Sequence, residues 1–275
     1  MKTLSSFRYI VLLIFYGFIA SELLAQTDRP TSDYVPEIGQ KGKDVVWVPT
    51  PQELVDTMLS MAKVTAVDFV IDLGSGDGRT VISAAKKGAH ALGIEYNPDL
   101  VALSRKNAEL EGVSGMTEFI EADLFEYDLS KATVITMFLL PEINLKLRSR
   151  LLDLKPGTRL VSNTFPMGDW EADYEVTTPE NWNSWNTALL WIVPAKVNGT
   201  WKLGTQELTI RQEFQMIYGK LANGSNLATI SNGRLRGNEI TFSINGTLYL
   251  GKVDGNKMEG TYFKDGKELK WSASR

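Results

Sequence analysis

The chain has 275 residues, of which 43% are hydrophobic and 23% are charged, and its 29 Lys and Arg residues are outnumbered by 33 Asp and Glu residues. This composition is typical of a folded globular protein and argues against disorder. The absence of Cys excludes disulfides, thiol nucleophiles and Cys-based metal sites, and the single His disfavours a His-based triad or metal site. The net charge of −4 argues against nucleic acid as the main partner, because no overall positive field attracts phosphates.

The first 25 residues have the pattern of a secretory signal peptide. Lys2 and Arg8 precede an uncharged apolar run over residues 9–21, and the small residue Ala25 closes the segment. This run is shorter than the roughly 20 residues that a membrane-spanning helix requires, and an uncleaved N-terminal anchor is the alternative. In both cases the preceding positive charge predicts that the rest of the chain lies outside the cytoplasm, as a periplasmic, secreted or membrane-anchored protein.

The pattern of the remaining chain changes once. Up to residue 194, buried strand-like runs alternate with helix-like stretches, whereas residues 198–275 alternate apolar and polar positions between Asn-Gly and Asp-Gly pairs. Such pairs are strong signals for hairpin turns, and we place one at each of positions 223, 232, 245, 254 and 265. We therefore predict an α/β domain over residues 26–194, with its core at 51–194, and an antiparallel β domain of about six to eight strands over 198–275.

The elements of the first domain follow from hydrophobic periodicity. Thr50 is predicted to cap a helix whose first position is Pro51. The apolar run from Asp68 to Gly74 is typical of a buried parallel strand. Further strands are expected at 89–96, 116–121, 133–140, 159–165 and 188–193, and helices at 80–87, 99–111 and 142–152. This alternation predicts a Rossmann-like, doubly wound sheet that binds its ligand at the carboxyl ends of the strands.

The loop after the first strand carries most of the chemical information, in the sequence Asp72-Leu-Gly74-Ser-Gly76-Asp77-Gly78. Its glycines permit a tight turn and a close approach of the backbone to a ligand. The spacing differs from the Gly-x-Gly-x-x-Gly of dinucleotide sites, and its two aspartates would repel a pyrophosphate. The loop therefore favours a cationic ligand over a nicotinamide cofactor. Glu95, at the end of the second strand, lies where an acidic residue accepts both ribose hydroxyls.

These motifs resemble those of class I S-adenosylmethionine-dependent methyltransferases over residues 45–194. Within that class, residues 48–51, 138–142 and 154–170 are similar to the small protein-lysine methyltransferases that act on a membrane-embedded ATP synthase subunit and to their bacterial relatives. The resemblance implies S-adenosyl-L-methionine as the cofactor and a protein as the substrate, with a membrane or envelope protein as one form of it. The cofactor-binding residues that it implies are Asp72, Gly74, Ser75, Gly76, Asp77 and Gly78 at the methionine end, Glu95 at the ribose, and Asp123 and Leu124 at the adenine.

The acceptor side is less defined by the sequence. Glu142 and Asn144 follow the fourth strand, at the edge where the reacting methyl group should lie, and we place both in the acceptor pocket, where polar groups could orient an amine. In the alternative interpretation, Glu142 only begins a helix, where the helix dipole favours a carboxylate.

Aromatic residues leave further alternatives open. Trp47 fits a lid over the cofactor or a core position. Four tryptophans between residues 170 and 191 fit a peptide groove or ordinary packing: Trp170, Trp182, Trp185 and Trp191. The leading functional prediction is an S-adenosylmethionine-dependent methyltransferase that modifies protein lysines. The alternative is an exported, non-catalytic binding protein that retains the fold, because the cofactor is not expected to be abundant outside the cytosol.

Overall fold

The computed structural model describes residues 34–42, 45–179 and 185–275. The predicted leader at residues 1–25 and Trp182 therefore lie outside the described residues. Within these ranges, none of the helices combines the length and the apolar character needed to cross a membrane.

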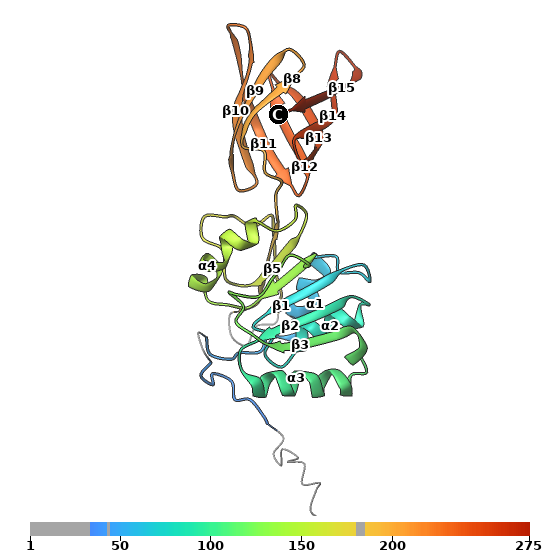
Figure 1. Ribbon diagram of the computed structural model, residues 1–275, viewed down its shortest axis with the longest axis vertical. Helices are drawn as coiled ribbons and strands as arrows, with labels where there is room; N and C mark the ends of the chain where they lie inside the picture. Colours follow the sequence, from blue (N-terminus) through green and yellow to red (C-terminus); the bar gives the residue numbers. More distant parts are fainter. Residues whose placement is uncertain (1–33, 43–44, 180–184) are drawn as a thin grey trace, which may run out of the picture. The chain divides into compact units, whose positions relative to one another are not determined.

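The first domain is built on a seven-stranded sheet with the spatial order β3-β2-β1-β4-β5-β7-β6. Figure 1 labels β1, β2, β3 and β5 of this sheet. β1 to β5 are parallel, whereas β7 runs antiparallel to both β5 and β6. The order reverses between β1 and β4, which is the switch point where such sheets bind ligands. The prediction of a Rossmann-like sheet is confirmed. The strands are β1 (Phe69–Leu73), β2 (His90–Glu95), β3 (Thr117–Glu121), β4 (Val134–Met137), β5 (Arg159–Asn163), β6 (Tyr174–Thr177) and β7 (Thr187–Ile192).

The expected helices are present, with boundaries shifted by a residue or two. They are α1 (Gln52–Met61), α2 (Arg79–Lys86), α3 (Pro98–Leu110) and α4 (Pro141–Leu152), and a short 3₁₀ helix (Ser114–Met116) precedes β3. Side chains of α1, α2 and α3 pack on one face of the sheet, and α4 packs on the other with Leu129, Met167 and Trp170. The sheet is therefore buried on both faces, as its continuous apolar strands require.

The predicted cap at Thr50 is wrong. Pro51 occupies the capping position of α1, and no side chain bonds the first free N–H groups of this helix. The Thr50 hydroxyl instead accepts a hydrogen bond from the Asn163 side chain at 3.3 Å, and its carbonyl accepts one from the Arg79 guanidinium at 2.9 Å. Thr50 thus ties the segment before α1 to β5 and α2. β6 was not predicted, because all four of its residues are exposed and carry no burial pattern.

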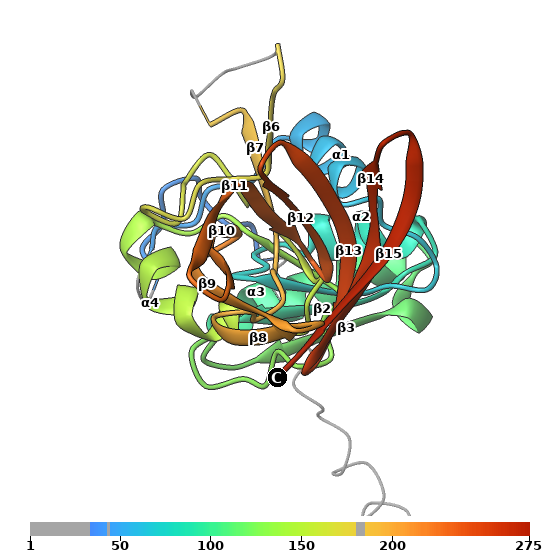
Figure 2. The same ribbon diagram turned by 90° about the horizontal axis from the view of Figure 1, so that it is seen from above.

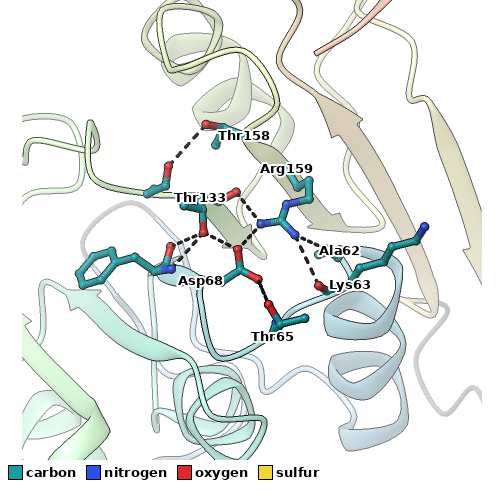
Figure 3. Close-up of polar contacts among 9 residues, drawn as sticks. Ala62, Lys63, Thr65, Asp68, Thr133, Thr158 and Arg159 are labelled. Atoms are coloured by element: carbon teal, nitrogen blue, oxygen red, sulfur yellow. Dashed lines mark hydrogen bonds and ion pairs between the residues drawn. The ribbon is translucent and has the colours of Figure 1, made fainter. Parts of the chain in front are cut away.

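The amino ends of three adjacent strands are joined by a polar network (Figure 3). Asp68 precedes β1, Thr133 precedes β4 and Arg159 begins β5. The Asp68 carboxylate accepts hydrogen bonds from the Thr133 hydroxyl at 2.7 Å and the Thr65 amide at 2.9 Å, and it pairs with the Arg159 guanidinium. Burial raises the pKa of Asp68, but these hydrogen bonds and the Arg159 charge outweigh burial and lower the pKa below its usual range.

The second domain is a closed eight-stranded antiparallel barrel, and its strands follow one another in chain order (Figure 2). Its interior is filled by apolar side chains, among them Trp201, Phe242, Met258 and Trp271. The prediction of a small antiparallel β domain is confirmed. The strands are β8 (Gly199–Leu203), β9 (Gln206–Glu213), β10 (Met216–Asn223), β11 (Asn226–Arg236), β12 (Glu239–Ile244), β13 (Thr247–Asp254), β14 (Lys257–Lys264) and β15 (Lys267–Ser274).

Four of the five predicted turns connect barrel strands, but the pair Asn232-Gly233 does not. These two residues lie inside β11, where the pairing with β10 and β12 shifts register. A Cβ atom at Gly233 would lie 2.3 Å from the carbonyl oxygen of Ile217 on β10. The pair therefore forms a β-bulge, in which glycine allows two backbones to approach closely.

Two of the tryptophans belong to the core rather than to a groove. Trp170 and Trp191 are both fully buried, and the Trp191 indole donates to the Trp170 carbonyl at 2.7 Å. Phe214, between β9 and β10, stacks on Trp170 with ring centroids 5.9 Å apart. These rings extend the apolar core on the α4 side of the sheet.

Candidate active site

A cavity of about 430 Å³ lies at the carboxyl ends of β1, β2 and β4, which meet at one edge of the sheet. Most of the predicted cofactor residues line it: Asp72, Gly74, Ser75, Gly76, Asp77, Glu95, Asp123 and Leu124. Gly78, Glu142 and Asn144 do not line it. The structure therefore brings together the residues that follow β1, β2 and β3, and it separates them from the two residues predicted for the acceptor.

The glycine loop is held in a conformation that requires glycine. Gly74, Gly76 and Gly78 have φ values of 73°, 55° and 83°, in the left-handed region that other residues rarely adopt. A Cβ at Gly76 would lie 2.6 Å from the Trp47 indole nitrogen, which shows that this ring covers the loop. Trp47 lines the cavity and is half-buried, which fits the lid better than the core position, the two alternatives that the sequence left open. Gly78 has a packing role, because a Cβ there would meet Phe119 and Ser104.

Glu95 ends β2 and holds the glycine loop from the neighbouring strand. Its carboxylate accepts hydrogen bonds from the backbone N–H groups of Gly76 at 3.0 Å, Tyr96 at 2.9 Å and Asn97 at 3.0 Å. Three donors on one carboxylate fix its position beside the cavity, so it is preorganised to accept further donors from a ligand. This geometry suits the predicted role of Glu95 at a ribose.

Asp72 lies at the end of β1 and is almost fully buried. Its carboxylate accepts a hydrogen bond from the Thr136 hydroxyl at 2.6 Å. Burial raises the pKa of Asp72 to about 7, with smaller contributions from the negative charges of Glu95 and Asp77. Because a cation in the cavity would favour the ionised form, this carboxylate suits a ligand that carries an ammonium or sulfonium group.

The two other polar residues of the loop have different surroundings. The Ser75 hydroxyl is buried and has no hydrogen-bond partner among the described residues, so it is available to a ligand. Asp77 forms an ion pair with Arg79 at 2.6 Å. The negative charge of Asp77 is therefore largely neutralised within the loop, in contrast to the sequence-based interpretation that both aspartates attract the ligand.

Asp123 and Leu124 follow β3 on the far side of Glu95. One carboxylate oxygen of Asp123 accepts the Phe125 N–H at 2.8 Å, which orients the side chain, and Leu124 packs against the apolar core. An apolar wall beside a fixed carboxylate suits the flat face and the amino group of an adenine.

Neither of the residues predicted for the acceptor pocket, Glu142 and Asn144, lines the cavity. Glu142 is exposed in the first turn of α4, where the helix dipole favours a carboxylate, as in the alternative interpretation of the sequence. Asn144 is fully buried, and its amide donates to the carbonyl oxygens of Phe165 at 3.1 Å and Pro166 at 3.4 Å. Ile143, between them, lines the cavity instead. Side chains on a helix turn by about 100° per residue, so the residue that reaches the cavity depends on how α4 packs.

Three aromatic residues line the cavity beyond the glycine loop, and only Trp185 among them was considered from the sequence, as one of four tryptophans that fit a peptide groove or ordinary packing. Phe138 follows β4, Phe165 follows β5 and Trp185 precedes β7, and all three are half-buried. The sequence pattern could have identified Phe138 and Phe165, since each is an aromatic residue that follows a parallel strand at its carboxyl end. Among the described residues, no group of three or more His, Asp and Glu side chains could hold a metal ion.

The cavity fits S-adenosylmethionine, whose ammonium and sulfonium groups suit Asp72, whose ribose suits Glu95 and whose adenine suits Asp123. The unpaired Ser75 hydroxyl leaves one further polar group for the ligand. Together with the Rossmann-like sheet, this arrangement defines a class I S-adenosylmethionine-dependent methyltransferase.

Comparisons with known proteins specify the family. The model of the ANTKMT methyltransferase domain matches residues 72–174. A protein-lysine N-methyltransferase from Saccharolobus islandicus is 42% identical over 152 residues, which cover 54% of this chain and 94% of that protein. A human lysine N-methyltransferase named for a subunit of ATP synthase is 36% identical over 129 residues, which cover 46% of this chain and 55% of that protein. The chain belongs to the same methyltransferase family as the Saccharolobus islandicus protein.

A solved structure agrees with the class of enzyme, an S-adenosylmethionine-dependent methyltransferase. An RNA methyltransferase from Salinibacter ruber, crystallised with S-adenosyl-L-homocysteine, is 48% identical, with a TM-score of 0.52, over 55% of this chain and 96% of that chain. The protein is therefore an S-adenosylmethionine-dependent methyltransferase. The family model ends at residue 174, before the barrel begins.

Proposed function

We propose that the protein is a protein-lysine N-methyltransferase. The observation that carries this proposal is the 42% identity to a protein-lysine N-methyltransferase over 94% of that protein's length. The net charge of −4 supports a protein acceptor over a nucleic acid, because a negatively charged protein repels a phosphate backbone.

Methyl transfer mainly requires that the protein align the acceptor nitrogen with the methyl group of the cofactor. S-adenosylmethionine supplies a methyl group that is already activated by its sulfonium. The glycine loop and Asp72 would hold the methionine end of the cofactor, Glu95 would hold its ribose, and Trp47, which lies over Gly76, would exclude water. An acceptor lysine has to lose its proton before its nitrogen attacks, since the ammonium form has no free electron pair.

Labelled S-adenosylmethionine tests the proposal. The full-length protein is incubated with separate protein and RNA fractions, and the label is located by mass spectrometry. We expect label on lysine side chains of protein, and we expect Glu95→Gln to reduce both labelling and S-adenosylhomocysteine affinity. Label confined to RNA would overturn the lysine proposal and would favour the activity named for the Salinibacter ruber structure.

We also propose that the enzyme acts outside the cytoplasm, on an exported or envelope protein. The basis is the leader pattern of Lys2, Arg8 and the apolar run over residues 9–21. Cell fractionation, with N-terminal sequencing of the mature chain, tests this proposal, and a cytosolic protein with an intact N-terminus would overturn it. Tight cofactor binding without methyl transfer to any envelope fraction would favour the non-catalytic alternative.

A further inference from the structure

The cavity has two chemically different halves. Among the described residues that line it, the acidic ones are Asp72, Asp77, Glu95 and Asp123, and all of them follow or end β1, β2 or β3. The half beyond β4 is lined by Phe138, Leu139, Leu140, Ile143, Phe165 and Trp185. The first half therefore contains the polar side chains that suit the polar groups of the cofactor, and the second half has an apolar and aromatic surface.

The sheet topology explains why three rings from distant parts of the sequence meet. β4 and β5 are parallel neighbours, so the residues that follow them lie at the same edge. β7 runs antiparallel to β5, with Asn163 paired to Ala188, so the residues that precede β7 lie at this edge too. Phe138, Phe165 and Trp185 therefore lie beside the switch point between β1 and β4.

The three rings form one continuous surface, which we call the aromatic wall. Phe138 stacks on Phe165 with centroids 5.9 Å apart and an interplanar angle of 17°. The Trp185 ring meets Phe138 edge-on, with centroids 5.7 Å apart and an angle of 64°. All three side chains are half-buried, so each keeps part of its surface toward the cavity.

Phe165 is held in place by its backbone. Its carbonyl accepts hydrogen bonds from Asn144 at 3.1 Å and from the Ser162 hydroxyl at 2.7 Å. The preceding residue, Thr164, has a φ of 59°, and its N–H donates to the Thr187 carbonyl at 2.7 Å. A non-glycine residue in this region costs free energy and persists where its surroundings demand it, often at a functional site. The wall is thus a built feature rather than a loose cluster.

We propose that the aromatic wall of Phe138, Phe165 and Trp185 is the acceptor site, and that it binds the alkylammonium end of a lysine side chain. The inference rests on the proposed lysine activity. Aromatic faces attract ammonium cations through their negative quadrupole, and quaternary ammonium groups bind them well. The four-carbon stem of lysine packs on the same apolar surface.

Because cation–π attraction favours the charged amine, the wall binds the lysine as an ammonium, and the proton has to leave afterwards. No carboxylate lines this half of the cavity among the described residues, so no acidic side chain stabilises the charged amine there. Removal of the amine from water opposes the cation–π attraction and lowers the pKa of the lysine, and the proton leaves to water before transfer. The neutral nitrogen then forms a bond to the methyl carbon as the carbon–sulfur bond breaks. The bonding electrons go to sulfur, and the nitrogen becomes a methylammonium cation against the rings.

Choline and its uncharged isostere 3,3-dimethylbutan-1-ol test the site, because they share a shape and differ in charge. Their binding to the S-adenosylhomocysteine complex is measured by saturation-transfer nuclear magnetic resonance. We expect choline to bind roughly 3- to 30-fold more tightly than the isostere, as cation–π energies imply. Equal binding of the two probes would overturn the proposal.

Substitutions locate the effect. Phe138→Leu and Trp185→Leu should abolish the preference for choline and raise the KM for the protein acceptor, while S-adenosylhomocysteine affinity stays within about twofold. Trp185→Phe retains a ring and should retain the preference, which guards against loss through misfolding. Phe263→Leu is the matched control, because this ring is 60% exposed on β14 and does not line the cavity. Persistence of the preference in both leucine variants would contradict the assignment.

The outcomes separate the two proposals. Lysine labelling without a choline preference would reject the aromatic wall and leave the lysine activity standing. A choline preference without labelled lysine would reject the lysine activity and support a different alkylamine acceptor at the same wall.

Discussion

The side-chain amide of Asn144 on α4 donates to the carbonyl oxygen of Phe165 across 3.1 Å and so links the helix after β4 to the loop after β5. Asn144 is fully buried and bonds the Pro166 carbonyl as well. The residue therefore acts on the ring of Phe165 through its backbone rather than on the acceptor. Asn144 is a positioning residue in a place where the sequence suggested a catalytic one.

Replacement of this amide should affect turnover and stability together. In Asn144→Ala the buried carbonyls lose their donor, and we expect the free energy of unfolding to fall by about 1–3 kcal/mol. We expect kcat to fall while S-adenosylhomocysteine affinity is retained, because the cofactor half of the cavity is untouched. Glu142→Gln, two residues earlier and exposed, should change stability by less than about 0.5 kcal/mol. Equal losses in both variants by urea unfolding and initial rates would contradict this assignment.

The protonation of Asp72 should appear in the stability of the ligand-free protein. Its pKa is about 7 in the folded chain, above the value of an unfolded aspartate, so the folded state keeps a proton that the unfolded state loses. This term stabilises the fold at low pH and is lost as pH rises from about 4 to 7, by up to about 4 kcal/mol. The free energy of unfolding of Asp72→Asn should lack this decrease between about pH 4 and 7. The variant Asp99→Asn, at an exposed position, should keep the decrease. The same pH dependence in Asp72→Asn as in the wild type would contradict the conclusion that burial raises the pKa of Asp72.

The same carboxylate should make cofactor affinity depend on pH. Because the ionised form is needed to pair with a ligand cation, we expect S-adenosylhomocysteine, which retains the amino group, to bind more weakly as pH falls below about 7. Calorimetry between pH 5.5 and 8 measures this dependence, with the pH values chosen as about 1.5 units below and 1 unit above the raised pKa. Asp72→Asn should bind S-adenosylhomocysteine weakly over the whole pH range. If the affinity of this variant still changed with pH, the titrating group would be a residue other than Asp72.

The space around Gly93 on β2 should not tolerate a side chain. A Cβ there would lie 2.5 Å from the Ser75 hydroxyl and 2.7 Å from the Phe119 ring. We expect Gly93→Ala to cost about 1–3 kcal/mol of stability through overpacking, and to weaken S-adenosylhomocysteine binding by displacing Ser75. Gly115→Ala is the control, since no atom lies within 4 Å of its Cβ position. Urea unfolding and calorimetry on both variants measure the two effects, and a stable Gly93→Ala with normal affinity would disprove the close fit.

The network at the opposite edge of the sheet should matter for stability alone. Arg159→Met leaves the Asp68 carboxylate, which is 5% exposed, without its cation, and we expect a loss of about 3 kcal/mol. Asp68 has a lowered pKa in the wild type, so its contribution is present at neutral pH and is lost as pH falls through the folded pKa. S-adenosylhomocysteine affinity should be unchanged, and the double variant Asp68→Asn, Arg159→Met should be more stable than Arg159→Met. A large loss of affinity would show coupling between the two edges.

The α/β sheet, the barrel and the cofactor half of the cavity can be predicted from the amino-acid sequence. These features rest on local signals: continuous apolar strands, Asn-Gly and Asp-Gly turns, and a glycine loop whose left-handed residues have to be glycine. Asp72 and Glu95 were found from their places at strand ends, because parallel strands bring their carboxyl ends to one edge regardless of the remaining packing.

Packing between distant elements sets which of two neighbouring side chains reaches the cavity and which one pairs elsewhere. Ile143 reaches it and Asn144 does not, because the rotation of α4 is set by its packing on the sheet. Asn232-Gly233 forms a bulge rather than a turn, because Ile217 on the adjacent strand lies against it. The aromatic wall joins residues 138, 165 and 185 through strand order and through the hydrogen bonds that hold Phe165. Such contacts depend on elements that are distant in the sequence, and a local pattern carries no information about them.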